Sequence, residues 1–177
     1  MREELFDLIQ SLATAEHQFS RNTKLFKAGD RVVHIHCLRS GEAHFYKKDS
    51  DIIIKRYSAP SIIAEASLFS DHYHCTCVAA SRVETYSLAK TLMLEELRTN
   101  ERLAHLWMEY LSHQIVQERK MHAVLSMKTV RERFEAFNLM HDDHDHLNLT
   151  NIARIIGVSR EALYREVAKK TKPKSAA

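Results

Sequence analysis

The stretch from Leu147 to Lys170 reads Leu-Asn-Leu-Thr-Asn-Ile-Ala-Arg-Ile-Ile-Gly-Val-Ser-Arg-Glu-Ala-Leu-Tyr-Arg-Glu-Val-Ala-Lys-Lys and predicts two short helices joined by a tight turn. Thr150 is the candidate N-cap of the first helix, and Ser159 is the candidate N-cap of the second. Gly157 stands where the first helix should end, because glycine adopts positive φ at little cost. The apolar residues that we expect to face inward are Ile152, Ala153, Ile156, Leu163 and Val167.

The second of these helices carries polar side chains that we expect to face outward. A helix start with Arg160 and Glu161 suits the reading of base edges in the major groove of DNA. The candidate DNA contacts are Thr150, Ser159, Arg160, Glu161, Tyr164, Arg165 and Lys169. The charge agrees, because residues 147–177 contain seven Lys or Arg and two acids, a net +5, which leaves residues 1–146 at −2 of the chain's total of +3.

The residues before Lys90 favour β-structure. Short runs rich in β-branched and aromatic residues predict strands at 31–36, 43–46, 52–57, 75–78 and 83–88. Gly29 and Gly41 stand at turns beside these runs. We therefore expect an antiparallel sandwich or roll.

Between Lys90 and Met140 the sequence contains no Gly or Pro and favours helices. A short helix is expected from Thr91 to about Arg98, and a longer one from about Asn100 to Lys128. Seam residues at spacings of three, four and seven run along the longer helix: Met108, Leu111, Ile115, Glu118, His122, Leu125 and Thr129. This seam predicts a homodimer interface, in which Glu118 and His122 are candidates for fixing the register; a core helix of a single chain is the alternative. A second apolar edge is expected to cover the roll: Leu103, Leu106, Trp107 and Tyr110.

Several motifs resemble one regulator family. The segment Val-Ser-Arg-Glu-Ala-Leu-Tyr-Arg at 158–165 resembles the recognition helix of cyclic-AMP-receptor/FNR regulators, whose pattern is Ser-Arg-Glu, three residues and Arg. The segments at 26–30 and 38–46 resemble the two β-roll turn motifs of the family, and 63–69 resembles its ligand cassette. The segment 130–137 resembles the start of the helix that follows the dimer helix. The resemblance covers about residues 20–170.

The resemblance implies an α+β fold with an N-terminal antiparallel β-roll of the double-stranded β-helix or jelly-roll type and a winged-helix-like helix-turn-helix. The expected domains are a sensor roll at 1–90, a short helix and long dimerisation helix at 91–128, and a DNA-binding domain at 129–177. The implied function is sequence-specific transcription regulation by a homodimer on double-stranded DNA with an inverted repeat, with RNA polymerase as a candidate partner. No β-wing is evident after the recognition helix, so we expect weaker DNA affinity than the family has.

The ligand cassette departs from that of the nucleotide-binding members. The family pairs a Gly-Glu that holds the ribose with an Arg that holds the phosphate, whereas this chain has Ala64 before Glu65 and no arginine in the segment 73–77. Where those receptors place a purine-contacting Thr-Ser on the dimer helix, this chain has Glu118-Arg119. The candidate pocket residues are Glu65, Tyr73, His74, Cys75 and Arg119. Glu65 is either a ligand contact or a structural acceptor for backbone N–H groups, and we expect a signal other than cyclic AMP, or none.

Two other functions stay open. One is a ligand-binding or dimer-poisoning protein with a vestigial helix-turn-helix. The other is a metal or redox sensor that uses His72, His74, Cys75 and Cys77, although alternation along a strand would place the histidines and cysteines on opposite faces. The segment 141–146, His-Asp-Asp-His-Asp-His, is a weaker metal candidate, and we expect neither metal nor cofactor.

An enzyme is disfavoured, because the sequence contains no glycine-rich phosphate loop and no Gly-x-Ser-x-Gly elbow. With 45% hydrophobic and 28% charged residues, the chain has the composition of a globular protein. Because neither a signal sequence nor an apolar run of about 18 residues is present, we expect a cytoplasmic protein that does not use a membrane.

Overall fold

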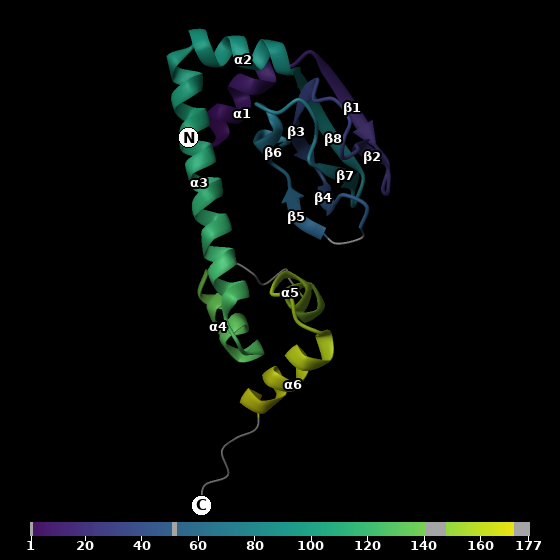
Figure 1. Cartoon of the computed structure of the whole chain (residues 1–177), viewed down its shortest axis with the longest axis vertical. Helices are drawn as coiled ribbons and strands as arrows, with labels where there is room; N and C mark the ends of the chain where they lie inside the picture. The colour runs from purple at the N-terminus through teal and green to yellow at the C-terminus, as the bar shows by residue number, and fades with distance from the viewer. Residues whose placement is uncertain (1, 51–52, 141–147, 172–177) are drawn as a thin grey trace, which may run out of the picture. The chain divides into compact units, whose positions relative to one another are not determined.

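The computed structural model describes residues 2–50, 53–140 and 148–171, which form two compact units at residues 1–111 and 112–177 (Figure 1). The first unit is a β-roll with helices on one side, and the second is entirely helical in its described part. The α+β class predicted from the sequence is confirmed, and the long helix contributes residues to both units. The boundaries of the three expected domains stay a prediction.

Two antiparallel sheets make up the roll. One contains, in order across the sheet, β1 (Ala15–Phe19), β8 (Val83–Ala89), β3 (His34–Ser40) and β6 (Ser61–Ile63). The other contains β2 (Lys24–Phe26), β7 (Cys75–Ala79), β4 (Glu42–Lys47) and β5 (Ile53–Ser58). The sheet registers place His36 opposite both Ser87 and Ile63, and Phe45 opposite both Lys55 and Cys77.

The predicted strands correspond to β3, β4, β5, β7 and β8, with one correction. The run at 31–33 does not belong to a strand; Arg31 makes only an isolated bridge to His72, and β3 begins at His34. The sequence did not predict β1, β2 and β6, all of which are edge strands. β1 is almost wholly exposed, so it lacks the alternation of apolar and polar residues that identifies a half-buried strand.

The sheet of β3 and β8 is buried on both faces. Leu38 faces the interior of the roll, while Ile35 and Cys37 face the covering helices. These helices are α1 (Arg2–Ser11), α2 (Lys90–Thr99) and the start of α3 (Glu101–Ser126), and a short 3-10 turn, η1 (Glu65–Ser67), follows β6. The second apolar edge of α3 lies in this core as predicted: Leu103, Leu106, Trp107 and Tyr110.

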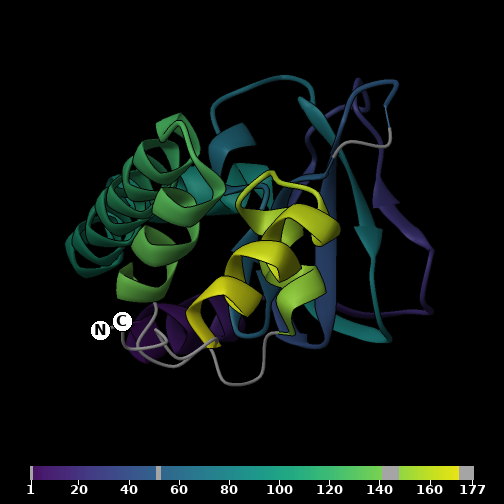
Figure 2. The ribbon, with the colours of Figure 1, turned by 90° about the horizontal axis from the view of Figure 1, so that it is seen from below.

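The second unit packs the end of α3 with α4 (Val130–Met140), α5 (Leu149–Ile155) and α6 (Arg160–Thr171), which Figure 2 shows from the α6 end. Its core contains one residue of α3 and one of α4 together with the inward residues of the last two helices: Val124, Phe137, Ile152, Ala153, Ile156 and Leu163. The inward-facing positions predicted for the two short helices are therefore confirmed, with Val167 packed at the margin. None of the helices in the described ranges has the length and apolar character needed to cross a membrane.

Candidate functional site

The turn between α5 and α6 is built as the sequence predicts at Gly157 and Ser159. Gly157 has a φ of +66°, and the next residue, Val158, donates its backbone N–H to the carbonyl of Ala153 at 2.9 Å. The Ser159 hydroxyl accepts from the backbone N–H of Ala162 at 3.1 Å, which is an N-cap contact. Two short helices are thus joined by the four residues 156–159.

The prediction that Thr150 caps the first helix is wrong. Asn148 is the N-cap of α5, and its side-chain oxygen accepts from the backbone N–H of Asn151 at 2.9 Å. Thr150 is the second residue of α5 and is half-buried. Both residue types cap well, and Asn148 stands at the position from which a side chain reaches the free N–H groups of the first turn.

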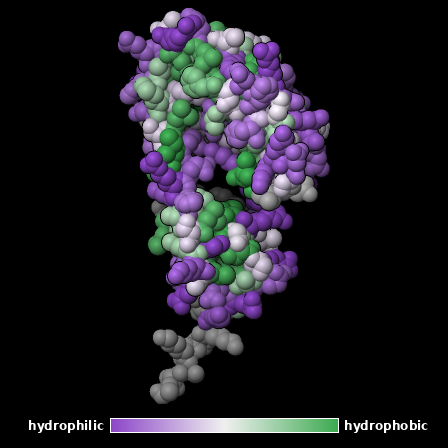
Figure 3. All heavy atoms as spheres, viewed as in Figure 1, coloured by the Kyte–Doolittle hydropathy of each residue, from purple (hydrophilic) through white to green (hydrophobic). Residues whose placement is uncertain are grey.

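The outer face of α6 brings together the predicted polar residues, all of them exposed: Arg160, Glu161, Tyr164, Arg165 and Lys169. The Arg160 guanidinium lies over the ring of Tyr164, 5.8 Å from its centroid. Lys169 forms an ion pair with Glu166 at 2.8 Å. Figure 3 shows that the α6 end of the second unit is mainly hydrophilic. This face can donate several hydrogen bonds to an anionic partner.

Sequence reasoning missed Arg133, on α4. Its guanidinium donates to the backbone carbonyls of Met127, Ile156 and Gly157 at 2.9, 3.1 and 3.3 Å. A signal was available only for the start of α4, where Thr129 and Glu132 form the Thr-x-x-Glu capping box. Thr129 is consequently not part of the α3 seam, because α3 ends at Ser126.

The other predicted seam residues lie along α3 with different exposure. Met108, Ile115 and Leu125 are exposed to 59%, 51% and 40%. Leu111 is half-buried and packs against the core of the first unit. The polar seam residues Glu118 and His122 are exposed.

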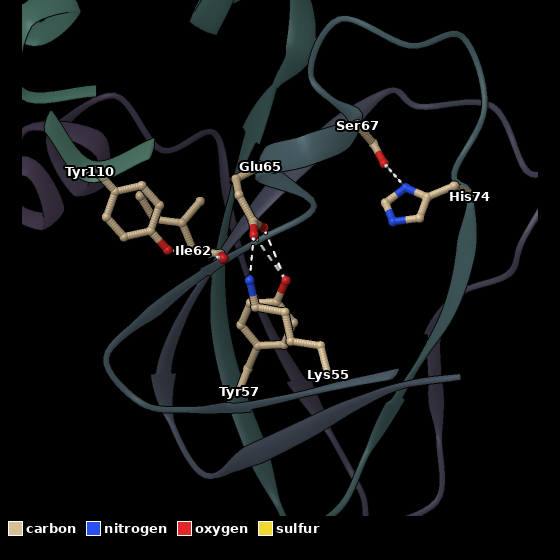
Figure 4. A network of polar contacts seen from close by, with 7 residues as sticks. All are labelled: Lys55, Tyr57, Ile62, Glu65, Ser67, His74 and Tyr110. Atoms are coloured by element: carbon tan, nitrogen blue, oxygen red, sulfur yellow. Dashed lines mark hydrogen bonds and ion pairs between the residues drawn. The ribbon is translucent and has the colours of Figure 1, made fainter. Parts of the chain in front are cut away.

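In the ligand cassette, Glu65 is buried and bound by the protein's own side chains (Figure 4). The Tyr57 hydroxyl donates to the two carboxylate oxygens of Glu65 at 3.0 and 3.2 Å, and the Lys55 ammonium lies 3.2 Å from Oε1. Burial, together with the Glu65 carboxylate, raises the pKa of Tyr57 well above its ordinary value, so the hydroxyl stays protonated as the donor. The partners of Glu65 are therefore side chains of β5, whereas the sequence suggested backbone N–H groups, and the role of Glu65 as a ligand contact stays a prediction.

The other candidate pocket residues differ in their exposure to solvent. Tyr73 is buried and donates to the carbonyl of His34 at 2.7 Å, and burial raises the pKa of Tyr73 to about 12. His74 is exposed, and its Nδ1 lies 3.0 Å from the Ser67 hydroxyl. Cys75 is buried, and burial raises the pKa of its thiol to about 12. Arg119 is exposed on α3 in the second unit.

The His and Cys cluster does not converge. His72 and His74 are exposed, whereas Cys75 and Cys77 are buried in the roll interior. Among the residues that the structure describes, no group of three or more His, Cys, Asp or Glu side chains could hold a metal ion. The candidate segment 141–146 lies outside the described residues.

Ala64 retains the backbone of the glycine that the family has at this position. Its φ is +71°, in the left-handed region that an alanine adopts only at a cost of about 1 kcal/mol. Ala64 therefore keeps a backbone conformation that favours glycine.

The family and structural comparisons agree with this geometry. The model of the cyclic nucleotide-binding domain matches residues 16–100, from β1 to α2. No curated protein shows a significant sequence match to the chain.

Three solved structures share the fold over most of their length. The c-di-GMP responsive global regulator CLP of Xanthomonas campestris has 15% identity and a TM-score of 0.70, with 95% of this chain and 91% of that chain covered. FixK2 from Bradyrhizobium japonicum has 13% identity and a TM-score of 0.71, with 92% and 89% covered. The catabolite activator protein of Thermus thermophilus has 18% identity and a TM-score of 0.57, with 94% and 82% covered. Residues 16–100 therefore belong to the cyclic nucleotide-binding domain family, in a chain that has the fold of the cyclic-AMP-receptor/FNR regulators.

Proposed function

We propose that the chain is a homodimeric transcription regulator that reads an inverted repeat in double-stranded DNA through α6, and that it responds to a signal other than cyclic AMP or to none. The observation that carries the proposal is the composition of α6. Its inner side, at Leu163, is buried in the helical core, while its outer side presents Arg160, Glu161 and Arg165 to solvent. A capped helix with this outer face fits the major groove.

The expected roles follow from the donors and acceptors of each side chain. Arg165 is free to pair with the O6/N7 edge of guanine through its fork of N–H groups. Glu161 accepts from the N4 amine of cytosine, and Arg160, held over Tyr164, serves a base or a phosphate. The backbone N–H groups after Ser159 suit a phosphate at the positive end of α6, and the Thr150 hydroxyl of α5 is a further candidate phosphate contact.

Dimerisation is supported by the exposed apolar side chains of α3. Met108 and Ile115 are seven residues apart, and Leu125 lies ten residues further, so the three repeat along one side of a continuous helix. A second copy of α3 is the partner of matching length and spacing. Two α6 helices in such a dimer would read half-sites about one helical turn of DNA apart.

The signal is inferred from the cassette. Glu65 is already paired with the Lys55 ammonium and hydrogen-bonded by Tyr57, and the described residues of the segment 73–77 offer no guanidinium for a phosphate. Loss of a charge-assisted contact worth about 1.5–3 kcal/mol predicts that cyclic AMP does not bind tightly. Calorimetry with cyclic AMP, and with c-di-GMP because the similar regulator CLP responds to it, tests this inference; micromolar cyclic AMP binding would contradict it.

Selection of duplexes from a random pool, followed by binding assays at several salt concentrations, tests the DNA-binding function. The Arg165→Ala variant should lose about 1–3 kcal/mol on the selected site and lose specificity there. As the matched control, Lys169→Ala should weaken all duplexes alike and flatten the salt dependence. If no inverted repeat is enriched and Arg165→Ala binds like the parent, α6 is vestigial, and a ligand-binding or dimer-poisoning role becomes the better proposal.

A further inference from the structure

Arg133 connects two segments of the second unit that are far apart in the sequence. Its Nε donates to the carbonyl of Met127 at 2.9 Å, just beyond the end of α3. Its Nη1 donates to the carbonyls of Ile156 and Gly157 at 3.1 and 3.3 Å, in the turn that precedes α6. All three acceptors lie at the carboxyl ends of helices, where carbonyls lack partners within the helix and the helix dipole favours a cation.

The backbone that carries Arg133 is itself fixed by the capping box of α4. The Thr129 hydroxyl accepts from the backbone N–H of Glu132 at 3.2 Å, and the Glu132 carboxylate accepts from the backbone N–H of Thr129 at 2.9 Å. The N–H of Arg133 then donates to the Thr129 carbonyl at 3.1 Å. The side chain therefore starts from a rigid helix end close to α3.

The contacts need the shape of arginine. One planar guanidinium supplies donors that point toward α3 and toward the turn at the same time. The lysine side chain is shorter, and its ammonium carries all of its donors on one nitrogen atom. The turn also comes close to this group, because a Cβ at Gly157 would lie 3.6 Å from Nη1 of Arg133 and 3.5 Å from a methyl of Leu125. Ser159, the N-cap of α6, follows only two residues later.

We propose that Arg133 is a positioning residue for DNA recognition: it holds the 156–157 turn against the end of α3 and so fixes the direction in which α6 leaves that turn, without touching DNA. The proposal rests on the proposed function for its consequence, though not for the contacts themselves. A dimer that reads two half-sites needs its two α6 helices at one defined spacing and angle. A flexible turn before α6 would allow several spacings and angles, of which only one fits the DNA.

Hydrogen exchange measures the local part of the proposal without DNA. In Arg133→Lys, the amides of Val158, Ala162 and Leu163 should exchange about tenfold faster than in the parent, because the turn opens more often once it loses its carbonyl contacts. The matched control is Arg131→Lys, an exposed arginine of the same helix that pairs with Glu135. Its rates should stay within about twofold of the parent.

Arg133→Met, which keeps the stem and removes the charge, should accelerate the same amides further. If Arg133→Met unfolds the second unit altogether, the exchange rates of Arg133→Lys alone test the proposal. Unchanged exchange at the turn in Arg133→Lys would overturn the proposal.

DNA binding measures the consequence. Arg133→Lys should lower affinity for the selected duplex about tenfold and leave affinity for random duplex and the salt slope unchanged, because the phosphate contacts remain in place. In Arg133→Met, which removes the charge, a salt slope reduced by about one would mean that Arg133 contacts a phosphate itself, and the positioning role would be wrong.

The two proposals can fail separately. If the parent protein selects no duplex, the proposed function fails. The exchange measurement still tests whether Arg133 holds the 156–157 turn against the end of α3. If the parent selects an inverted repeat and Arg133→Lys binds both duplexes like the parent, the positioning role fails alone.

Discussion

At the scale of single residues, Gly41 is fixed by both conformation and space. Its φ is +85°, and a Cβ there would overlap the carbonyl oxygen of Arg82 in the neighbouring turn. Gly41→Ala should therefore lower the free energy of unfolding by about 2–4 kcal/mol, from left-handed strain and overpacking together. Gly29 is the matched control, because its φ is +89° and no atom lies within 4 Å of the Cβ position.

Chemical denaturation of both variants separates the two causes. Gly29→Ala should cost only the conformational strain, about 1 kcal/mol. Equal losses for the two variants would mean that the space beside Arg82 has no influence.

His36 is a buried histidine on β3, and burial, helped by the nearby His17 and His34, lowers its pKa to about 4. Within the described residues its Nδ1 has no hydrogen-bond partner, and its ring lies against Phe26. Its pKa in the unfolded chain is about 6.5. Between these two pKa values the unfolded chain binds a proton that the folded chain does not, so stability falls as the pH falls from about 6.5 to 4.

The His36→Phe variant should remove most of this pH dependence. The free energy of unfolding of the parent, measured in urea, should drop by about 2–3 kcal/mol more between pH 7 and pH 4.5 than that of the variant. His72→Gln, at an exposed position, should behave like the parent. Parallel curves for parent and His36→Phe would show that another group governs acid unfolding.

At the scale of the element, the N-cap of α5 differs between the sequence prediction and the structure. Asn148 and Thr150 are both good capping residues two positions apart, and propensity alone does not choose between them. The structure assigns the cap to Asn148, so Asn148→Ala should destabilise the second unit by about 1 kcal/mol. Thermal unfolding of Thr150→Ala, expected to cost less than about 0.5 kcal/mol, is the comparison. The reverse order would restore Thr150 as the cap.

Elements were predictable where the local signal was strong. The helices α2 and α3 begin and end within about two residues of the predicted positions, because a stretch free of Gly and Pro with apolar spacing is hard to mistake. The strands β1, β2 and β6 were missed because β1 is almost wholly exposed and because β2 and β6 are only three residues long. The outward face of α6 was predicted from the same spacing that identified Leu163 as buried.

Contacts between elements were not predictable in the same way. The partners of Glu65 come from β5, and the reversal of the chain between β5 and β6, which belong to different sheets, brings Lys55 and Tyr57 beside it. Likewise, the reach of Arg133 to Gly157 spans 24 positions and depends on how α4 packs against the last two helices. Periodicity gives the buried side of a helix, whereas such contacts require the packing angle between helices.

At the scale of the whole molecule, the exposed seam of α3 predicts the oligomeric state. Ile115→Glu places a charge among apolar side chains that would be buried between two copies, and should convert the dimer to a monomer at micromolar concentration. Light scattering gives the mass directly. His113→Glu adds the same side chain on an exposed position nearly opposite on the helix and should leave the dimer intact. A monomeric parent would contradict the proposed dimer.

The three cysteines give the molecule a further property. Cys37, Cys75 and Cys77 are all buried, and burial raises the pKa of each thiol, so few thiolates exist at neutral pH and none is accessible. We therefore expect the native cysteines not to react with maleimide reagents, so that a cysteine introduced at the surface would be the site that is labelled. A single Lys169→Cys substitution would then carry one spin label per chain, and pulsed electron resonance would report the separation of the two α6 helices in the proposed dimer directly in solution.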